Sequence, residues 1–137
     1  MTIVYVAKSK TLQDWGSDVG ISKSIYKVGL FEGKAADAAA DLGARSYLAQ
    51  TDWAVIASRP TDLNDEAAML EKMAERATRV DQNYYPRLKG DRGIFKVNVH
   101  NVEAALIVKN AMASGETKVP KLKPADIGNY LIDAALR

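Results

Sequence analysis

The chain has 137 residues, of which 47% are hydrophobic and 26% are charged, and its formal net charge is +2. This composition is that of one folded globular domain and excludes a disordered chain, while the absence of cysteine excludes disulfides, thiolate nucleophiles and cysteine-ligated zinc. No segment resembles a signal peptide or contains the roughly 18 apolar residues of a membrane span, so we expect a cytoplasmic protein with no membrane partner.

The first half of the chain predicts three strands and one helix. β-Branched and aromatic residues mark short strands at residues 2–7, 25–31 and 52–58. After the second strand, the alanine-rich segment 34–44 favours a helix that Gly43 ends. The glycine-containing segment 9–24 has no clear periodicity, and we interpret it as a long loop.

The second half begins with the clearest helical pattern in the sequence. In segment 62–82, Leu70, Met73 and Ala77 recur on one helical face. A turn-rich basic loop, a strand, a helix and a polar linker are predicted next, at residues 83–93, 93–97, 99–112 and 114–124. The last segment, 125–137, has the spacing of an amphipathic tail helix.

These elements predict an α/β fold of the α+β kind. We expect a small mixed β-sheet of about four strands flanked by three helices, with an additional C-terminal tail helix. The α/β domain would span residues 1–113, and residues 114–137 would form the linker and tail. The segment between the second and third strands could be a crossover joining parallel neighbours, but the strand order stays open.

Basic residues are concentrated late in the chain. Residues 87–123 contain 8 basic and 3 acidic residues, whereas residues 35–86 contain 5 basic and 9 acidic ones. Cations interleaved with an aromatic ring can hold phosphates and stack bases. The candidate nucleic-acid contacts are Tyr85, Arg87, Lys89, Arg92 and Lys96. The alternative is a solvated surface with a loop anchored by one buried tyrosine.

Short motifs in two predicted strands resemble the start of the GIY-YIG endonuclease superfamily. They are Ile3-Val4-Tyr5 and Tyr26-Lys27-Val28-Gly29. The segment 68–72 resembles the start of the family's glutamate-bearing helix. Segments 93–97 and 100–106 resemble the closing strand and helix of the smaller phage and bacterial branch. The resemblance covers about residues 2–112 and implies a GIY-YIG-like fold.

The resemblance also implies a function: a metal-dependent endonuclease that hydrolyses nucleic-acid phosphodiesters with Mg²⁺ or Mn²⁺. In that family a tyrosine helps to activate water, an arginine on the first helix binds the phosphate, and a glutamate holds the metal. Tyr5 matches the tyrosine, Glu71 matches the metal-binding glutamate, and Lys27 replaces the second-motif tyrosine. One carboxylate can suffice because Mg²⁺ keeps several of its waters.

The first predicted helix departs from this pattern. The arginine position falls within Asp37-Ala38-Ala39, and Arg45 follows only later. Each matched residue also has a structural interpretation: Tyr5 as a core residue, Glu71 as a surface partner of nearby cations, and Lys27 as a snorkelling side chain.

The sequence therefore leaves three functions open. The first is the endonuclease, with Tyr5, Lys27 and Glu71 as catalytic residues. The second is a catalytically decayed module that binds nucleic acid through its basic residues. The third is an interaction or assembly protein whose tail, residues 125–137, docks on a protein partner or on a second copy.

Overall fold

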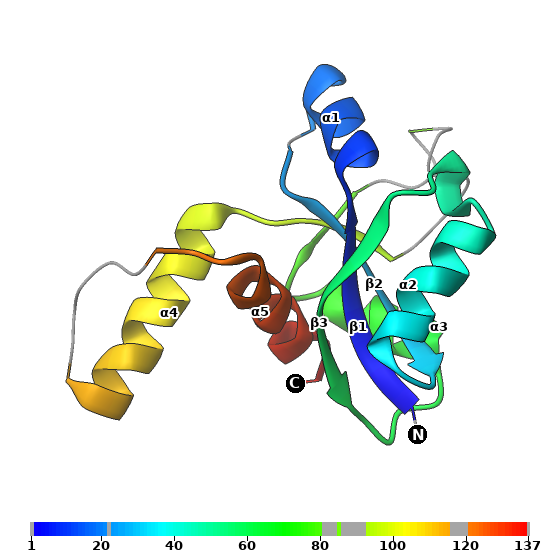
Figure 1. The fold of residues 1–137 in the computed structure, drawn as a ribbon. Coiled ribbons are helices and arrows are strands. Elements are labelled where there is room, and N and C mark those ends of the chain that lie inside the picture. The colour runs from blue at the N-terminus through cyan, green and yellow to red at the C-terminus, as the bar shows by residue number, and fades with distance from the viewer. Residues whose placement is uncertain (1, 22, 81–84, 86–92, 116–120, 137) are drawn as a thin grey trace.

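The computed structural model describes residues 2–21, 23–80, 85, 93–115 and 121–136, and Figure 1 shows their arrangement. Its strands are β1 (Thr2–Ser9), β2 (Ile25–Glu32), β3 (Trp53–Pro60), β4 (Thr78–Arg79) and β5 (Ile94–Lys96). Its helices are α1 (Lys10–Asp18), α2 (Ala35–Ala44), α3 (Glu66–Met73), α4 (Val99–Ser114) and α5 (Pro124–Leu136), with a short 3₁₀ turn η1 (Tyr47–Ala49). The α/β prediction is confirmed.

The strands form one five-stranded sheet in the order β3-β1-β2-β5-β4. Every neighbouring pair in it is antiparallel, so the sheet is not mixed in its pairing. The connection through α2 is a crossover, but it places β2 and β3 on opposite sides of β1 and not next to each other.

Strand β1 lies between β3 and β2 and is buried on both faces. Val4 and Val6 point to one face, called here the Val4 face, where α3 and α5 pack. Tyr5 and Ala7 point to the other, called here the Tyr5 face, where α1, α2 and Trp53 pack. Successive strand residues alternate between faces, so the five consecutive apolar residues Ile3-Val4-Tyr5-Val6-Ala7 of β1 build both cores.

The segment predicted as a long loop contains α1 instead, so that prediction was wrong for residues 10–18. Ser9 caps the helix by accepting a hydrogen bond from the Leu12 amide, and Asp52 accepts another from the Thr11 amide. Helix α1 buries Leu12 and Gly16 against the sheet. Its second cap comes from a residue about forty positions away, which a local pattern cannot reveal.

The long helix predicted for residues 62–82 was wrong in extent. Helix α3 begins after its N-cap Asp65 and ends at Met73. Thr78 and Arg79 then form β4, which pairs with β5 at the edge of the sheet. Pairing with a distant strand therefore overrides the helical periodicity of this segment.

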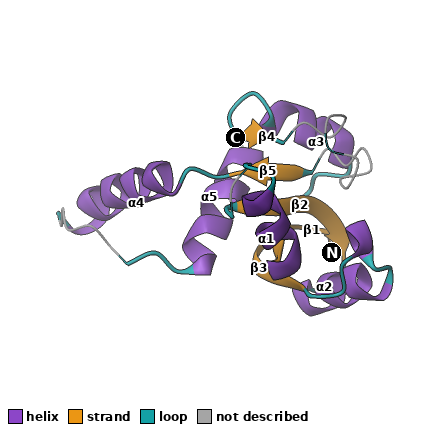
Figure 2. Ribbon diagram, turned by 90° about the horizontal axis from the view of Figure 1, so that it is seen from above, coloured by secondary structure: helices purple, strands orange, loops and turns teal. Residues whose placement is uncertain are grey.

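The C-terminal helix α5 packs directly on the sheet, as Figures 1 and 2 show. Leu131 and Ile132 are buried in the same cluster as Val4 and Val28. Helix α4 extends away from the body in both views, and its Val108 and Met112 are exposed. No helix among the described residues has the length and apolar character needed to cross a membrane.

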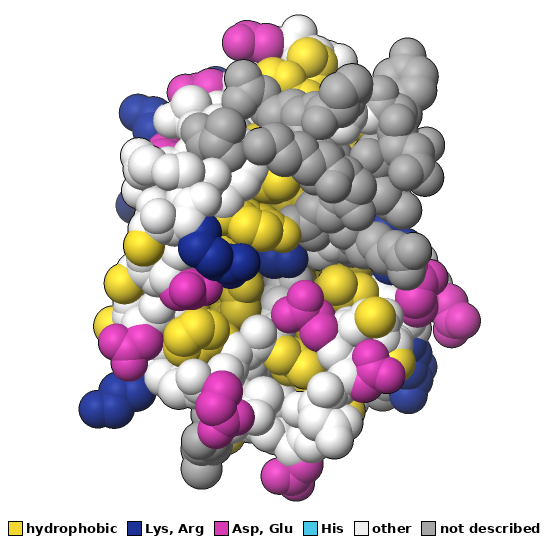
Figure 3. Space-filling model, turned by 90° about the vertical axis from the view of Figure 1, so that its right-hand side faces the viewer, with side chains coloured by type: hydrophobic (Ala, Val, Ile, Leu, Met, Phe, Trp, Pro, Cys, Tyr) yellow, Lys and Arg dark blue, Asp and Glu magenta, His cyan; other side chains and the backbone are white. Residues whose placement is uncertain are grey.

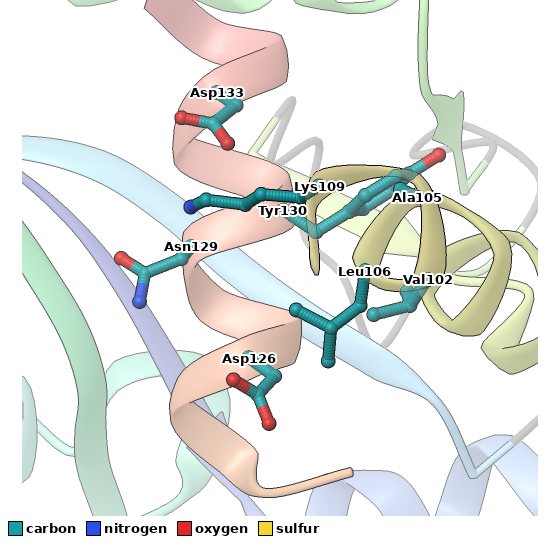
Figure 4. A pocket seen from close by; sticks show the side chains of 8 residues that line it. All are labelled: Val102, Ala105, Leu106, Lys109, Asp126, Asn129, Tyr130 and Asp133. Carbon is teal, nitrogen blue, oxygen red and sulfur yellow. The ribbon is translucent and has the colours of Figure 1, made fainter. Parts of the chain in front are cut away.

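A cavity of about 220 Å³ lies between α4 and α5. Figure 4 shows Lys109 reaching from α4 toward α5, which contributes Asp126 and Asp133. Both carboxylates already have partners: Asp126 accepts the Lys123 amide, and Asp133 lies 2.8 Å from a nitrogen of Arg59. We therefore interpret Asp126 and Asp133 as residues that stabilise α5 and its packing.

Candidate functional site

The structure brings Tyr5 and Lys27 to one face of the sheet. Tyr5 pairs with Gly29 and Ala7 pairs with Lys27 across the β1–β2 ladder, so all four residues share the Tyr5 face. Tyr5 and Lys27 are each only 5% exposed. Strand spacing puts the α-carbons of Lys27 and Gly29 about 7 Å apart.

Gly29 leaves open the space in which a phenol and a carboxylate come together. A β-carbon built on Gly29 would lie 2.9 Å from the Tyr5 hydroxyl oxygen and 3.0 Å from Oε2 of Glu66. The two oxygens are therefore no farther apart than the sum of these distances. Tyr5 reaches over the glycine toward the half-buried side chain of Glu66.

Glu66 is fixed at this place by the edge of β2. Strand β5 pairs with Ile25, Tyr26 and Lys27 and extends no farther along β2. Beyond that point the Leu30 amide donates a hydrogen bond of 2.8 Å to Oε2 of Glu66, the first residue of α3. The carboxylate thus takes the place of a missing strand partner.

The structure does not bring Glu71 to this group. Oε1 of Glu71 lies 3.1 Å from a guanidinium nitrogen of Arg79. Arg79 pairs with Phe95, whose side chain is buried in the cluster on the Val4 face. Glu71 and Tyr5 are therefore associated with opposite faces of the sheet.

Tyr26 also lies outside the group. Its ring belongs to the cluster on the Val4 face, as strand alternation next to Lys27 requires. Burial raises the pKa of the Tyr26 phenol, and a hydrogen bond with Gln13 only partly offsets this effect. Tyr26 therefore stays a neutral core residue near neutral pH.

Tyr47 gathers two cations beside the site. Nζ of Lys27 lies 5.1 Å from the centre of the Tyr47 ring, and Cζ of Arg45 lies 5.4 Å from it. Arg45 caps the end of α2 and forms an ion pair of 2.9 Å with Asp41. The arginine that follows the helix and the lysine of the second motif thus both lie against the Tyr47 ring.

The backbone around Tyr47 is strained. Ser46 and Leu48 have φ values of 46° and 53°, in the left-handed region that favours glycine. The Tyr47 carbonyl accepts a hydrogen bond of 2.9 Å from Nε1 of Trp53, and the two rings lie 5.7 Å apart. Packing of Tyr47 against a core tryptophan thus helps to hold Ser46 and Leu48 in a backbone conformation that these residue types do not favour.

Only part of the predicted nucleic-acid surface can be placed. Arg87, Lys89 and Arg92 lie outside the described residues. Lys96 pairs with Ile25 and is exposed on the same face as Lys27. Tyr85 is half-buried and meets the Trp15 ring edge-on at 5.7 Å.

Seen from the side of α2 and α3, the molecule has a mixed surface. Figure 3 shows Lys and Arg side chains near the middle of this face, with hydrophobic, Asp and Glu side chains around them. Positive and negative side chains therefore lie close together on this face.

The donor set at Gly29 fits a hard divalent cation with few protein ligands. No cluster of three or more His, Cys, Asp or Glu side chains occurs among the described residues. Glu66 is a half-buried carboxylate with one oxygen held by a backbone amide, and an ionised carboxylate can accept further ligands. Mg²⁺ and Mn²⁺ prefer such oxygen ligands and retain waters, so Glu66 fits this role in the same way as was expected of Glu71.

Comparisons of the chain with family models, with curated proteins and with solved structures give no match.

Glu66 and Tyr47 are the site residues that the sequence did not reveal. Glu66 lies directly after Asp65, the N-cap of α3, and an aspartate of this kind is the signal in the sequence for a helix start at Glu66. The sequence gave no signal for Tyr47. Its position depends on left-handed backbone at Ser46 and Leu48, and serine and leucine are not residues that predict such a conformation.

Proposed function

We propose that the protein is a GIY-YIG-like, divalent-metal-dependent endonuclease whose site combines Tyr5, Lys27 and Glu66. The observation that supports this most is the meeting of the Tyr5 hydroxyl and the Glu66 carboxylate over Gly29. A phenol and a carboxylate from distant segments face each other where the second motif provides its glycine.

Each side chain has a distinct part in phosphodiester hydrolysis. The Tyr5 hydroxyl orients the attacking water by a hydrogen bond, and the Lys27 ammonium lies on the same face to attract the phosphate. Glu66 would hold Mg²⁺ or Mn²⁺, which neutralises charge on the reacting phosphate when bound. Water adds to phosphorus, one P–O bond breaks, and the leaving oxygen takes up a proton.

A pair of matched variants tests the assignment of the carboxylate. Glu66→Gln removes the charge, but its amide oxygen can still accept the Leu30 amide, so the fold is retained. We expect at least about a hundredfold slower cleavage of plasmid DNA with Mg²⁺ or Mn²⁺, the range found when a key electrostatic group is lost. Glu71→Gln removes only a half-exposed partner of Arg79 and should retain cleavage.

The reverse result would contradict the proposal. If Glu71→Gln abolished cleavage and Glu66→Gln did not, the metal would belong to Glu71. If the unaltered protein retarded DNA without metal and never cleaved it, the binding module would be the better description. In that case its affinity should fall steeply as the salt concentration rises.

A further inference from the structure

A small hollow lies where β4 begins and β5 ends. Thr78 is the first residue of β4, Lys96 is the last residue of β5, and the two residues pair with each other. The start of α4 and the middle of α5 complete the wall of this hollow, which has a volume of about 60 Å³ and is called here the Lys96 hollow. Because the two strands end here, residues from both faces of the sheet line it.

The residues that line the Lys96 hollow are mostly hydrogen-bond donors. Six of the nine described residues that line it have a side chain that can donate, and none of the nine is acidic. The six are Arg76, Thr78, Lys96, Asn98, Asn101 and Tyr130. Two of them are cations, so the wall of the hollow is positively charged.

Several of these donors are unused within the described part of the chain. The side chains of Thr78, Lys96 and Asn101 make no hydrogen bond or ion pair with another described residue. Oδ1 of Asn98 accepts the His100 amide at 3.0 Å, and its amide group remains available to donate. The hollow therefore offers several donors to an acceptor that enters it.

Acidic residues on the neighbouring helices do not line the hollow. Oε1 of Glu71 lies 3.1 Å from a guanidinium nitrogen of Arg79, and Oε2 of Glu103 lies 3.7 Å from Nδ1 of His100. Glu75 is exposed and also lies outside the wall of the hollow. The partially positive N-terminal end of the 16-residue helix α4, capped by Asn98, adds to the positive potential of the two cations.

The size of the hollow and its donors limit the ligand. A volume of about 60 Å³ exceeds the roughly 10–15 Å³ that one water needs and is far below the roughly 300 Å³ of pockets for drug-sized molecules. Six donor side chains outnumber the roughly four acceptor sites of a carboxylate. Two cations match the charge of about −1.5 to −2 that a phosphate monoester carries at pH 7.

We propose that the Lys96 hollow binds a phosphate group, either inorganic phosphate or the terminal phosphate of a larger molecule. Arg76 and Lys96 neutralise its charge, and the hydroxyl and carboxamide side chains of the wall donate hydrogen bonds to its oxygens. The hollow contains none of the three residues of the proposed catalytic site, so this binding does not depend on the proposed nuclease activity.

Two matched pairs of variants test the location of the site. Lys96→Gln removes a charge from the wall, whereas Lys34→Gln removes an exposed charge before α2. Asn101→Asp adds a negative charge to the wall, whereas Asn64→Asp makes the same change at an exposed residue before α3.

We titrate each protein with inorganic phosphate at constant ionic strength and follow the backbone amides by NMR. The unaltered protein and the two control variants should show saturable shifts centred on residues 96–102. Lys96→Gln and Asn101→Asp should each weaken binding at least about tenfold, because one loses an attractive charge and the other gains a repulsive one.

The controls define the results that would overturn the proposal. Absence of saturable shifts in the unaltered protein would do so, and so would equal shifts on addition of sodium chloride alone. Equal affinities for Lys96→Gln and Lys34→Gln would place the phosphate elsewhere. If circular dichroism shows that one variant of the wall is unfolded, the other pair still decides the location.

Two further ligands distinguish the sources of the phosphate group. A dinucleotide that carries a terminal phosphate is compared with inorganic phosphate and with the same dinucleotide without the terminal phosphate. Tighter binding of the phosphorylated dinucleotide than of inorganic phosphate would identify the end of a nucleic-acid strand as the source, and the reverse order would identify free phosphate. Equal affinity for the two dinucleotides would contradict a site for a terminal phosphate.

Discussion

At the scale of single residues, the candidate site depends on a side chain that is missing. Gly29 is the position opposite Tyr5 on the next strand, where most residues would fill the space above the strand. The phenol uses that space to approach Glu66 from across the strand. The glycine of the second motif is therefore a positional requirement of the site.

We predict that Gly29→Ala lowers both activity and stability, and activity by more. The new β-carbon would lie 2.9 Å from the Tyr5 hydroxyl oxygen, 3.1 Å from Cζ of Tyr5 and 3.0 Å from Oε2 of Glu66, so both side chains would have to shift. The unfolding free energy should fall by about 1 kcal/mol, typical of a single substitution, while plasmid cleavage falls at least about tenfold. Urea unfolding and a cleavage assay measure the two effects. If the loss of cleavage, expressed as a free energy, were no larger than the loss of unfolding free energy, the space over Gly29 would matter only for folding.

The sequence could predict half of this site. The resemblance named Tyr5 and Lys27, and local composition predicted their strands. They share a face because β1 pairs with β2 in a register that the sequence left open. Glu66 reaches the site because β5 ends beside Lys27 and leaves the Leu30 amide without a strand partner. The residue at which β5 stops pairing with β2 depends on tertiary packing, and no spacing of residues in the sequence predicts it.

At the scale of elements, the clearest example is the start of α1. Ser9 ends β1 and caps α1, and its hydroxyl donates a short hydrogen bond to Oδ1 of Asp52. Oδ2 of Asp52 accepts both the amide and the hydroxyl of Thr11, at 3.0 and 2.9 Å. A carboxylate just before β3 therefore supports a helix that begins next to it in space.

This cap should make stability depend on pH. Burial acts to raise the pKa of Asp52, but the hydrogen bonds from Ser9 and Thr11 outweigh it, so the pKa lies below its ordinary value. A carboxyl with a depressed pKa in the folded state stabilises the fold above its unfolded pKa of about 3.9. The contribution is lost as the pH falls through the lower, folded pKa.

We predict that the unaltered protein and Asp52→Asn differ most in unfolding free energy near neutral pH. The difference should narrow below about pH 4, where Asp52 of the unfolded chain and then of the folded chain becomes protonated. Urea unfolding at a series of pH values measures this. In a double-mutant cycle with Ser9→Ala, the coupling energy should shrink over the same range. If the difference in unfolding free energy between the two proteins did not change with pH, Asp52 would not stabilise the start of α1 through its charge.

The elements that were mispredicted share a cause. Helix α1 was missed although Ser9 caps it locally, because Asp52 also supports its start from a distant segment, and α3 was extended too far because β4 pairs with β5. In contrast, the strands that begin at Thr2 and Ile25 and the alanine-rich helix were predicted well, because local composition favours them. Errors arose where a distant segment determines the structure.

At the scale of the whole molecule, α5 completes the core. Leu131 and Ile132 are at most 1% exposed and lie in the same cluster as strand residues of the Val4 face. The helix approaches β3 so closely because Gly128 has no side chain: a β-carbon there would lie 2.5 Å from Cβ of Ala57. The tail is thus packed as tightly as an internal element.

We predict opposite effects for two Gly→Ala substitutions in helices. Alanine is a better helix former than glycine by up to about 1 kcal/mol. In Gly43→Ala of α2 the new β-carbon would meet only the Thr51 carbonyl, at 3.4 Å. This substitution should therefore leave the unfolding free energy unchanged or raise it. Gly128→Ala gains the same propensity but forces α5 away from Ile56 and Ala57, which are part of strand β3. Overpacking of this kind costs about 1–3 kcal/mol, which exceeds the gain, so Gly128→Ala should lower the midpoint of urea unfolding. If Gly128→Ala were as stable as Gly43→Ala, α5 could not pack against β3 at this distance, and its tight attachment to the sheet would be refuted.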